Sequence, residues 1–200
     1  EEQLQEDALI DACFMFEADP NSWDTDRLVA ERLGCKFYPQ VIWHRSGSVA
    51  FHLHRTSDGI ATGGGSSLYS DGVYTRTNET LELPATDVAQ FFWDFLDASD
   101  NITLRMDIEG AEYNVMRRLI TTGLGCWINR LELEVHALYN QANFRKVQLD
   151  SAFGWLLRGC TPPVEVVVEN WYSRDPHVLR NMLDAPRQLR ELARSPLLHQ

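Results

Sequence analysis

The chain has 200 residues, 44% of them hydrophobic, which is enough for one globular domain with a substantial core. Its formal net charge of -11 and its scattered basic residues argue against binding to nucleic acid or to an anionic membrane surface. No apolar run reaches the roughly 18 residues of a membrane span, so no membrane-spanning segment is predicted.

The cysteines show neither a CxxC pair nor the spacing of a zinc site, so we expect buried free thiols at Cys13, Cys35, Cys126 and Cys160. Two N-glycosylation sequons begin at Asn78 and Asn101. The chain starts at Glu1 without a methionine, and its acidic start is unlike a signal peptide. The compartment therefore stays open: a secretory or Golgi lumen or an organelle interior fits if a targeting segment lies upstream.

The first third of the chain predicts strands that alternate with helices. A buried strand at 13–17 ends in an acid, and a helix follows from a Ser22 or Asp24 cap to Leu33, with Gly34 after it. The apolar face of this helix would consist of Leu28, Val29 and Leu33. A strand is expected at 37–43, and Ser46-Gly47 is typical of a hairpin turn into a half-buried strand at 48–54.

After a Gly/Ser-rich loop at 56–71 the alternation continues. We expect a strand at 80–83 and a helix capped by Thr86 or Asp87, whose aromatic residues pack in the core: Phe91, Phe92, Trp93 and Phe95. Further strands are expected at 102–107, 128–135 and 164–171, with helices at 111–120 and 148–158 and two short helices after Asp175. This order predicts an α/β fold whose mostly parallel sheet is covered on both faces.

The end of the strand at 102–107 carries the most informative group of residues. Asp107, Glu109 and Glu112 surround Gly110 where the strand gives way to a helix. In open α/β sheets, ligands bind at such carboxyl ends. Glu112 fits a helix N-terminal acid favoured by the helix dipole. Asp107 and Glu109 could fix a substrate hydroxyl, accept its proton or bind a divalent cation, and the sequence leaves these roles open.

A second strand end carries polar groups at Glu134 and His136. Because this strand follows the one that ends at Asp107, the two residues are candidates for a catalytic base or a substrate contact. His52 and His54 share one face of an earlier strand and are expected to face solvent rather than to bind metal. No metal site is predicted.

Residues 102–112 resemble the signature of FkbM-type methyltransferases, which depend on S-adenosylmethionine (SAM): a strand, then Asp, a small aliphatic residue, Glu-Gly, a small residue and Glu. The resemblance extends to most of the chain. Segment 14–20 is similar to the family's second strand, whose terminal acid, here Glu17, binds the SAM ribose. Other resembling segments are Ser66-Ser67-Leu68, the Glu-x-His strand end at 131–136, and the Trp-containing strand at 168–172, which is typical of plant and algal members.

The resemblance implies a Rossmann-like class I methyltransferase sandwich over residues 1–174 and a helical tail at 175–200. Its cofactor would be SAM, held by Glu17 and Asp107. Asp107, Glu109, Glu134 and His136 would carry O-methylation of a hydroxyl on a sugar, glycan or small metabolite. The strands at 13–17 and 102–107 would be adjacent and parallel.

The family's first strand and its Gly-rich turn should precede Glu17, yet residues 1–16 contain no glycine. Residues 1–10 instead indicate the helix that follows such a turn. Either an upstream segment supplies the turn, or the domain is a catalytically inactive subunit of a larger assembly, with the leucines of the tail as a docking surface for a protein partner. In both cases we expect this chain to bind SAM weakly, because the methionine part of the cofactor would lack its backbone contacts.

Overall fold

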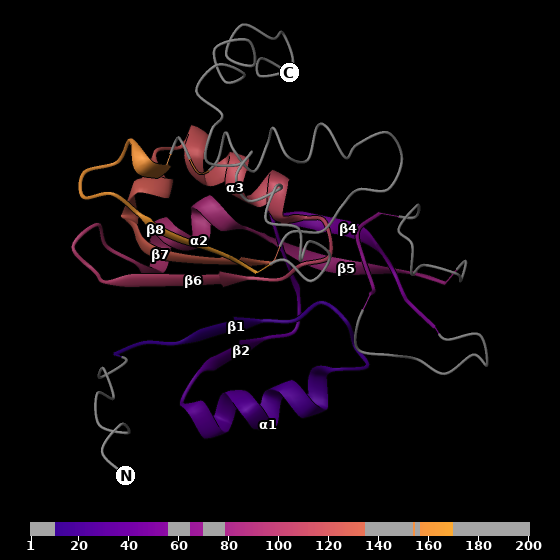
Figure 1. Cartoon of the computed structure of the whole chain (residues 1–200). Helices are drawn as coiled ribbons and strands as arrows, with labels where there is room; N and C mark the ends of the chain where they lie inside the picture. Colours follow the sequence, from indigo (N-terminus) through magenta and orange to yellow (C-terminus); the bar gives the residue numbers. More distant parts are fainter. Residues whose placement is uncertain (1–10, 56–64, 70–78, 135–153, 155–156, 170–200) are drawn as a thin grey trace, which may run out of the picture.

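The computed structural model describes residues 11–55, 65–69, 79–134, 154 and 157–169. Within these ranges helices are interspersed among the strands, four of which follow one another between the first two helices (Figure 1). The elements are β1 (Phe14–Phe16), α1 (Trp23–Leu33), β2 (Lys36–Tyr38), β3 (Val41–Trp43), β4 (Gly47–His52), β5 (Thr80–Asp87), α2 (Val88–Phe95), β6 (Ile102–Met106), α3 (Glu112–Thr121), the short 3-10 helix η1 (Leu124–Trp127), β7 (Ile128–Glu134) and β8 (Glu165–Glu169).

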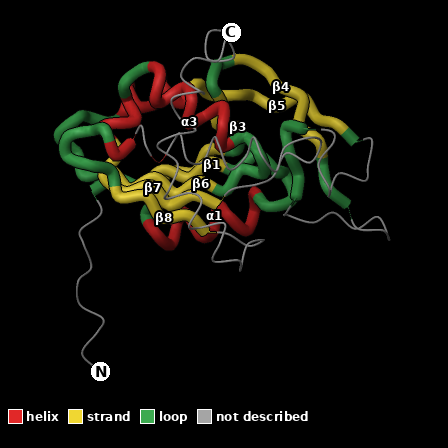
Figure 2. Tube along the Cα trace, turned by 45° about the horizontal axis from the view of Figure 1, so that its top comes forward, coloured by secondary structure: helices red, strands yellow, loops and turns green. Residues whose placement is uncertain are grey.

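The strands form three hydrogen-bonded groups, and most pairings are parallel. β1 pairs with β2, and β6, β7 and β8 form a parallel sheet in that order. β5 lies between β3, which is parallel to it, and β4, which is antiparallel. Figures 1 and 2 show α1 and α3 on opposite sides of the strands. The prediction of an α/β fold with mostly parallel strands is confirmed.

The β1–α1–β2 unit follows its sequence signals closely. Gly34 ends α1 in the left-handed conformation, at φ 71°, as expected for a helix C-cap. At the other end, the Trp23 indole N–H donates a hydrogen bond to the Glu17 carbonyl oxygen at 3.0 Å. The expected apolar face is wrong, because Ala30 is the buried residue of α1 and three larger side chains are exposed: Leu28, Val29 and Leu33.

The hydrophobic core lies between α3 and the β6–β7–β8 sheet. Met116 and Leu119 of α3 and Leu131 of β7 have no exposed surface, and the core extends to α2. Phe91 and Phe92 of α2 are buried as expected, whereas Trp93 and Phe95 are exposed. Because these side chains are fully buried and closely packed, they hold α3 and β7 against each other. The packing thereby also holds the ends of the strands in position.

Asp87 connects three elements at the end of β5. Its carboxylate caps α2 by accepting from the Ala89 amide at 2.9 Å, and Arg118 of α3 donates to the same carboxylate at 2.7 and 3.1 Å. Burial raises the pKa of Asp87, but the hydrogen bonds from Arg118 and Ala89 outweigh it and bring the pKa below its usual value. Asp87 is therefore the expected N-cap and also an ion-pair partner.

The expected strand at 37–43 is divided at Pro39, with β2 and β3 in different sheets. Proline lacks the N–H that a continuous ladder needs. The expected hairpin at Ser46-Gly47 is also wrong. β3 and β4 do not pair with each other but lie on either side of β5, where Ala85 is opposite both Val41 and Gly47.

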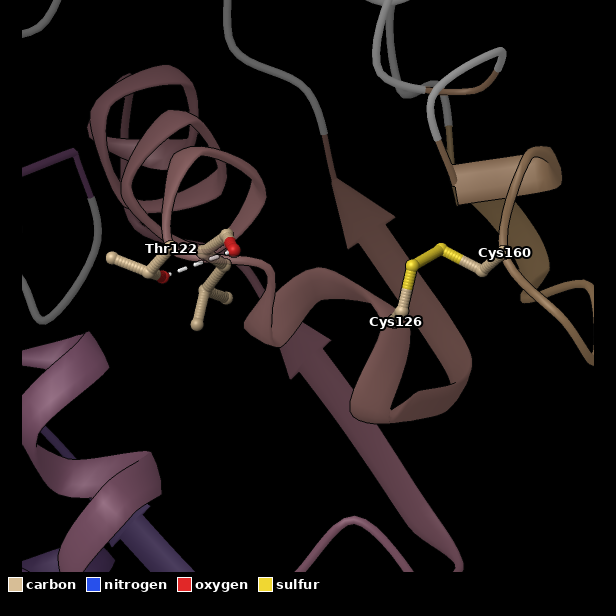
Figure 3. The surroundings of a disulfide bond; sticks show 4 residues. Thr122, Cys126 and Cys160 are labelled. Carbon is tan, nitrogen blue, oxygen red and sulfur yellow. Dashed lines mark hydrogen bonds between the residues drawn. A yellow bond between two sulfur atoms is a disulfide. The ribbon is translucent and has the colours of Figure 1, made fainter.

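The expectation of free thiols is wrong, because Cys13 pairs with Cys35 and Cys126 with Cys160. Figure 3 shows Cys126, in the turn after α3, joined to Cys160. The Thr122 hydroxyl, also drawn there, closes the last turn of α3 by donating to two carbonyl oxygens, that of Arg118 at 2.7 Å and that of Leu119 at 3.1 Å. The pairings depend on long-range folding, which cysteine spacing alone does not reveal.

The strands at 13–17 and 102–107 are not hydrogen-bonded neighbours, so the expected direct adjacency is wrong. β1 pairs with β2, and β6 pairs with β7. Aromatic contacts connect β1 to α2 instead: the ring centroid of Phe91 lies 5.1 Å from that of Phe14 and 5.0 Å from that of Phe16.

No helix of the described residues is long and apolar enough to span a membrane.

Candidate functional site

A cavity of about 190 Å³ lies at the carboxyl ends of β1 and β6. Three of the acids predicted for the site line it: Glu17 from the end of β1, and Asp107 and Glu109 from the segment after β6. Gly65, Ser66 and Leu68 also line it, as do residues of β3 and Phe51 of β4. The structure therefore brings together acids that are up to 92 residues apart in the sequence.

Glu17 lies in surroundings that disfavour its charge. Burial raises the pKa of this carboxyl from its usual 4.5 to about 7, and the nearby carboxylates of Asp26 and Asp19 add to the effect. The Asp19 amide opposes the shift by donating to Glu17 Oε1 at 2.6 Å. Glu17 therefore holds its proton more tightly than an exposed glutamate, and a perturbed pKa of this kind is common among functional carboxyls.

Asp19 is a buried acid that the sequence did not assign to the site. Its side chain is 2% exposed and lines the same cavity. The Ser66 hydroxyl donates to Asp19 Oδ2 at 2.6 Å, and Asn21 donates to Oδ1 through its backbone and side-chain nitrogens at 2.9 and 2.7 Å. Ser66 Oγ itself accepts from the His54 amide at 2.8 Å. The buried charge is thus compensated by hydrogen bonds, as such charges must be.

Glu109 adopts a left-handed backbone conformation, with φ 52°, which is uncommon for a residue with a side chain. Two contacts from segment 65–67 hold it: the Ser67 hydroxyl donates to the Glu109 carbonyl at 2.7 Å, and the Gly65 amide donates to Oε1 at 3.1 Å. Such a conformation costs about 1–3 kcal/mol and is typical of functional sites. Segment 65–67 therefore fixes acids on both sides of the cavity.

The other two acids of the signature differ sharply in exposure. Asp107 is exposed and lines the cavity, so a ligand could reach it. Glu112 is 1% exposed and lies in the first turn of α3, where its Oε1 accepts from the Ile108 amide at 3.0 Å. This confirms Glu112 as a helix N-terminal acid, which here stabilises the loop that carries Asp107 and Glu109.

The second strand end contributes less to the described site. Glu134 is the last residue of β7 and does not line the cavity, and His136 lies outside the described residues. The register that pairs Met106 with Leu133 places Glu134 beside Asp107 across the two parallel strands.

His52 is half-buried, with Nδ1 3.0 Å from the Thr80 hydroxyl. Among the residues the structure describes, no cluster of His, Cys, Asp and Glu could hold a metal ion.

The cavity has the chemistry of a site for a polar ligand with hydroxyl groups. Carboxylates from β1 and β6 face a space that Phe16 and Ile42 also line, so hydrogen-bond acceptors are combined with apolar surface. Its volume is below the roughly 300–1,000 Å³ of pockets for drug-sized ligands, so these residues would enclose one part of such a ligand.

Sequence reasoning missed Asp19 and Gly65 as site residues. The Asp-Pro-Asn run at 19–21 carries a signal for an Asx turn, in which the aspartate accepts from the backbone two residues on. That signal indicates a local turn, whereas burial of the carboxylate depends on Ser66, 47 residues away.

One comparison with known proteins gave a match. The family model described as "Methyltransferase FkbM domain" matches residues 8–159, which include all the residues that line the cavity. Neither the curated proteins nor the solved structures gave a match.

Proposed function

The chain belongs to the FkbM methyltransferase family, and on this basis we propose that it transfers a methyl group from SAM to a hydroxyl of a sugar, glycan or other small metabolite. The observation that carries the proposal is the cavity in which Glu17 faces Asp107 and Glu109. Acids at the carboxyl ends of two parallel strands suit a cofactor on one side and a hydroxyl substrate on the other.

The residues around Glu17 fit the ribose of SAM. A carboxylate can accept a hydrogen bond from each of two neighbouring hydroxyls, and Glu17 presents its carboxylate to the cavity. The raised pKa of Glu17 is consistent with a buried carboxyl whose backbone donors do not offset the effect of burial, so that hydroxyl donors from a ligand would stabilise its charge. Asp107, which lines the same cavity just after β6, is the second residue that we assign to cofactor binding.

When bound, SAM would supply an electrophilic methyl group: an O–CH3 bond to the substrate hydroxyl would form as the S–CH3 bond breaks, and S-adenosylhomocysteine would leave. Asp107 would accept the proton of that hydroxyl, and Glu109, fixed by Ser67 and Gly65, would orient it. Glu134 and His136 are proposed as further substrate contacts at the neighbouring strand end. Methyl transfer needs accurate placement of the nucleophile more than covalent help from the protein, and a rigid arrangement of acids provides such placement.

Calorimetric titration of the full-length gene product with SAM tests the ribose assignment. Glu17→Ala is expected to weaken binding at least tenfold, since a charge-assisted hydrogen bond contributes about 1.5–3 kcal/mol. Asp24→Ala is the matched control, because it removes an exposed acid from the first turn of α1 that does not line the cavity. Equal affinity of Glu17→Ala and the wild type would refute the assignment.

The catalytic assignment is tested separately with Asp107→Asn. We expect turnover to fall 10²- to 10⁴-fold, the usual contribution of a general base, while SAM affinity changes less. A panel of sugars and small hydroxyl compounds, with methyl transfer followed by mass spectrometry, would identify the substrate class. A full-length protein that binds SAM but methylates no hydroxyl would contradict the proposed reaction and favour a subunit role.

The proposal treats residues 1–174 as the methyltransferase domain and residues 175–200 as a helical tail that could dock a partner. Because residues 1–16 contain no glycine, we expect the 200 residues alone to bind SAM more weakly than micromolar. Micromolar binding in a titration of this chain would show that another segment provides the backbone contacts of a Gly-rich turn.

We further propose that the protein matures in a secretory lumen. The two disulfides support this, because disulfides persist in oxidising compartments and are rare where thiols are kept reduced.

A further inference from the structure

The segment before β6 contains the sequon Asn101-Ile102-Thr103, which has no part in the proposed site. Asn101 and Thr103 are both exposed, whereas Ile102 between them is 8% exposed. This is the alternation of a strand with one face in the core, and it places the acceptor amide and the hydroxyl of the sequon on the same, outer face. The Asn-x-Thr pattern is the acceptor pattern for N-linked glycans.

The surrounding backbone presents Asn101 on a well-ordered turn. The Asp100 amide donates to the Asp97 carbonyl at 3.0 Å, and the Asp97 amide donates to the Asp100 carboxylate at 2.7 Å. On the other side, the Ile102 amide donates to the side-chain oxygen of Asn129 in β7 at 2.7 Å. Residues 97–101 are all exposed, so a bulky glycan would meet no part of the core.

Exposed aromatic surface lies next to this turn. The register pairs Ile102 with Ile128, so Asn101 and Trp127, the last residue of η1, each directly precede a residue of this pair. The Trp127 ring packs edge-on against Trp93, with 5.0 Å between centroids, and Trp93 is 60% exposed.

The position leaves the cavity accessible. Asn101 precedes β6 and Asp107 follows it, so the two residues lie at opposite ends of the strand. At ~3.3 Å per residue, the six steps between them span about 20 Å. Both disulfides also lie on the Asn101 side, because each cysteine precedes a strand: Cys13 before β1, Cys35 before β2, Cys126 before β7 and Cys160 before β8.

We propose that Asn101 carries an N-linked glycan. Three observations support the site: the outward alternation of the sequon, the exposed turn at 97–101, and cysteines that are all paired in the described residues, which indicates the oxidising pathway where such glycans are attached. The inference concerns modification at the edge remote from the cavity and does not depend on the methyltransferase proposal.

The test is expression of the full chain in eukaryotic cells behind a secretory signal. An Asn78→Gln background removes the second sequon, which lies outside the described residues. Peptide-N-glycosidase F in heavy-oxygen water converts a glycosylated asparagine to labelled aspartate, which peptide mass spectrometry detects. Secreted and cell-retained chains are both measured, so the result does not depend on folding efficiency.

We expect label at residue 101 in this background and a faster-migrating band after enzyme treatment. Thr103→Ala should abolish both signals, whereas Thr103→Ser, which preserves the sequon, should retain them. An unlabelled Asn101 peptide from chains that entered the secretory pathway would overturn the proposal. Label that persists in Thr103→Ala would also overturn it, because the signal would then not come from the sequon.

Discussion

The two ends of the parallel strands are stabilised by different means. At the amino ends, disulfides connect β1 to β2 through the residues that precede them, and connect the turn before β7 to the segment before β8. At the carboxyl ends, hydrogen bonds from segment 65–67 hold Asp19 and Glu109 in place. The amino edge is thus held by covalent bonds. The carboxyl edge is held by hydrogen bonds, which a bound ligand can replace with its own.

The difference has an energetic meaning. A disulfide contributes several kcal/mol, whereas a typical hydrogen bond contributes about 1 kcal/mol net. The carboxyl edge also contains two destabilising features, the left-handed backbone of Glu109 and the buried carboxyl of Glu17. We therefore expect the amino edge to determine global stability and the carboxyl edge to open locally at lower free energy, as functional regions commonly do.

The largest expected effect tests the amino edge. Replacing the second disulfide by Cys126→Ser with Cys160→Ala should lower the free energy of unfolding by about 3–4 kcal/mol, the chain-entropy value for a loop of 34 residues. Removing the pair that closes 22 residues, Cys13 and Cys35, should cost about 3 kcal/mol. Denaturant unfolding measures both. A loss below about 1 kcal/mol in each variant would show that the disulfides do not stabilise this edge.

Ser66→Ala is the corresponding test at the carboxyl edge. The change leaves the buried Asp19 carboxylate without its Ser66 donor and the His54 amide without its acceptor, so we expect a loss of about 2 kcal/mol. Ser48→Ala is the matched control, because its hydroxyl donates to Glu82 at 2.7 Å on the exposed surface and should cost less than about 0.5 kcal/mol. Equal losses in the two variants would mean that burial of the Asp19 contact has no energetic consequence.

Sequence signals predicted the local part of this arrangement. The Asp87 cap of α2, the Gly34 end of α1 and the change from strand to helix around Gly110 follow from neighbouring residues, and the structure confirms them. The resemblance to the family, through the signature at 102–112 and the segment at 14–20, also grouped Glu17 with Asp107 and Glu109, and the three acids share the cavity.

Long-range features could not be predicted in the same way. The cysteine pairs and the division of 37–43 into two sheets depend on which strands become neighbours, and the burial of Asp19 depends on Ser66. A pattern of single residues does not contain this information, because each outcome is a property of two distant segments.

The third prediction concerns the charge of Glu17. Because burial raises its pKa from 4.5 to about 7, the native state retains a proton that the unfolded chain has released, and stability should fall as the pH rises from about 4.5 to 7. Glu17→Gln should be about 1–2 kcal/mol more stable than the wild type at pH 8, after allowance for partial exposure, and nearly equal to it at pH 4.

Denaturant unfolding at several pH values measures this difference. Glu31→Gln is the control, because it removes the same charge from an exposed position on α1. The burial argument fails if Glu17→Gln shows no gain over the wild type between pH 4 and pH 8.

The smallest effect on stability is expected at Glu109, where strain and hydrogen bonding oppose each other. Glycine accepts φ 52° without penalty, so Glu109→Gly relieves about 1 kcal/mol of strain but loses the bond from Gly65 and adds freedom to the unfolded chain. The net change should lie within about 0.5 kcal/mol, whereas methyl transfer by the full-length protein should fall at least tenfold.

Glu109→Gln separates the two contributions, since it keeps the side-chain acceptor for the Gly65 amide and the strained backbone. Its stability should match the wild type, and any loss of turnover would then come from the missing charge. If Glu109→Gly is as active as the wild type, the strained conformation at the carboxyl edge serves the fold alone. The contrast between a stabilising amino edge and a functional carboxyl edge would then rest on Glu17 and Asp107.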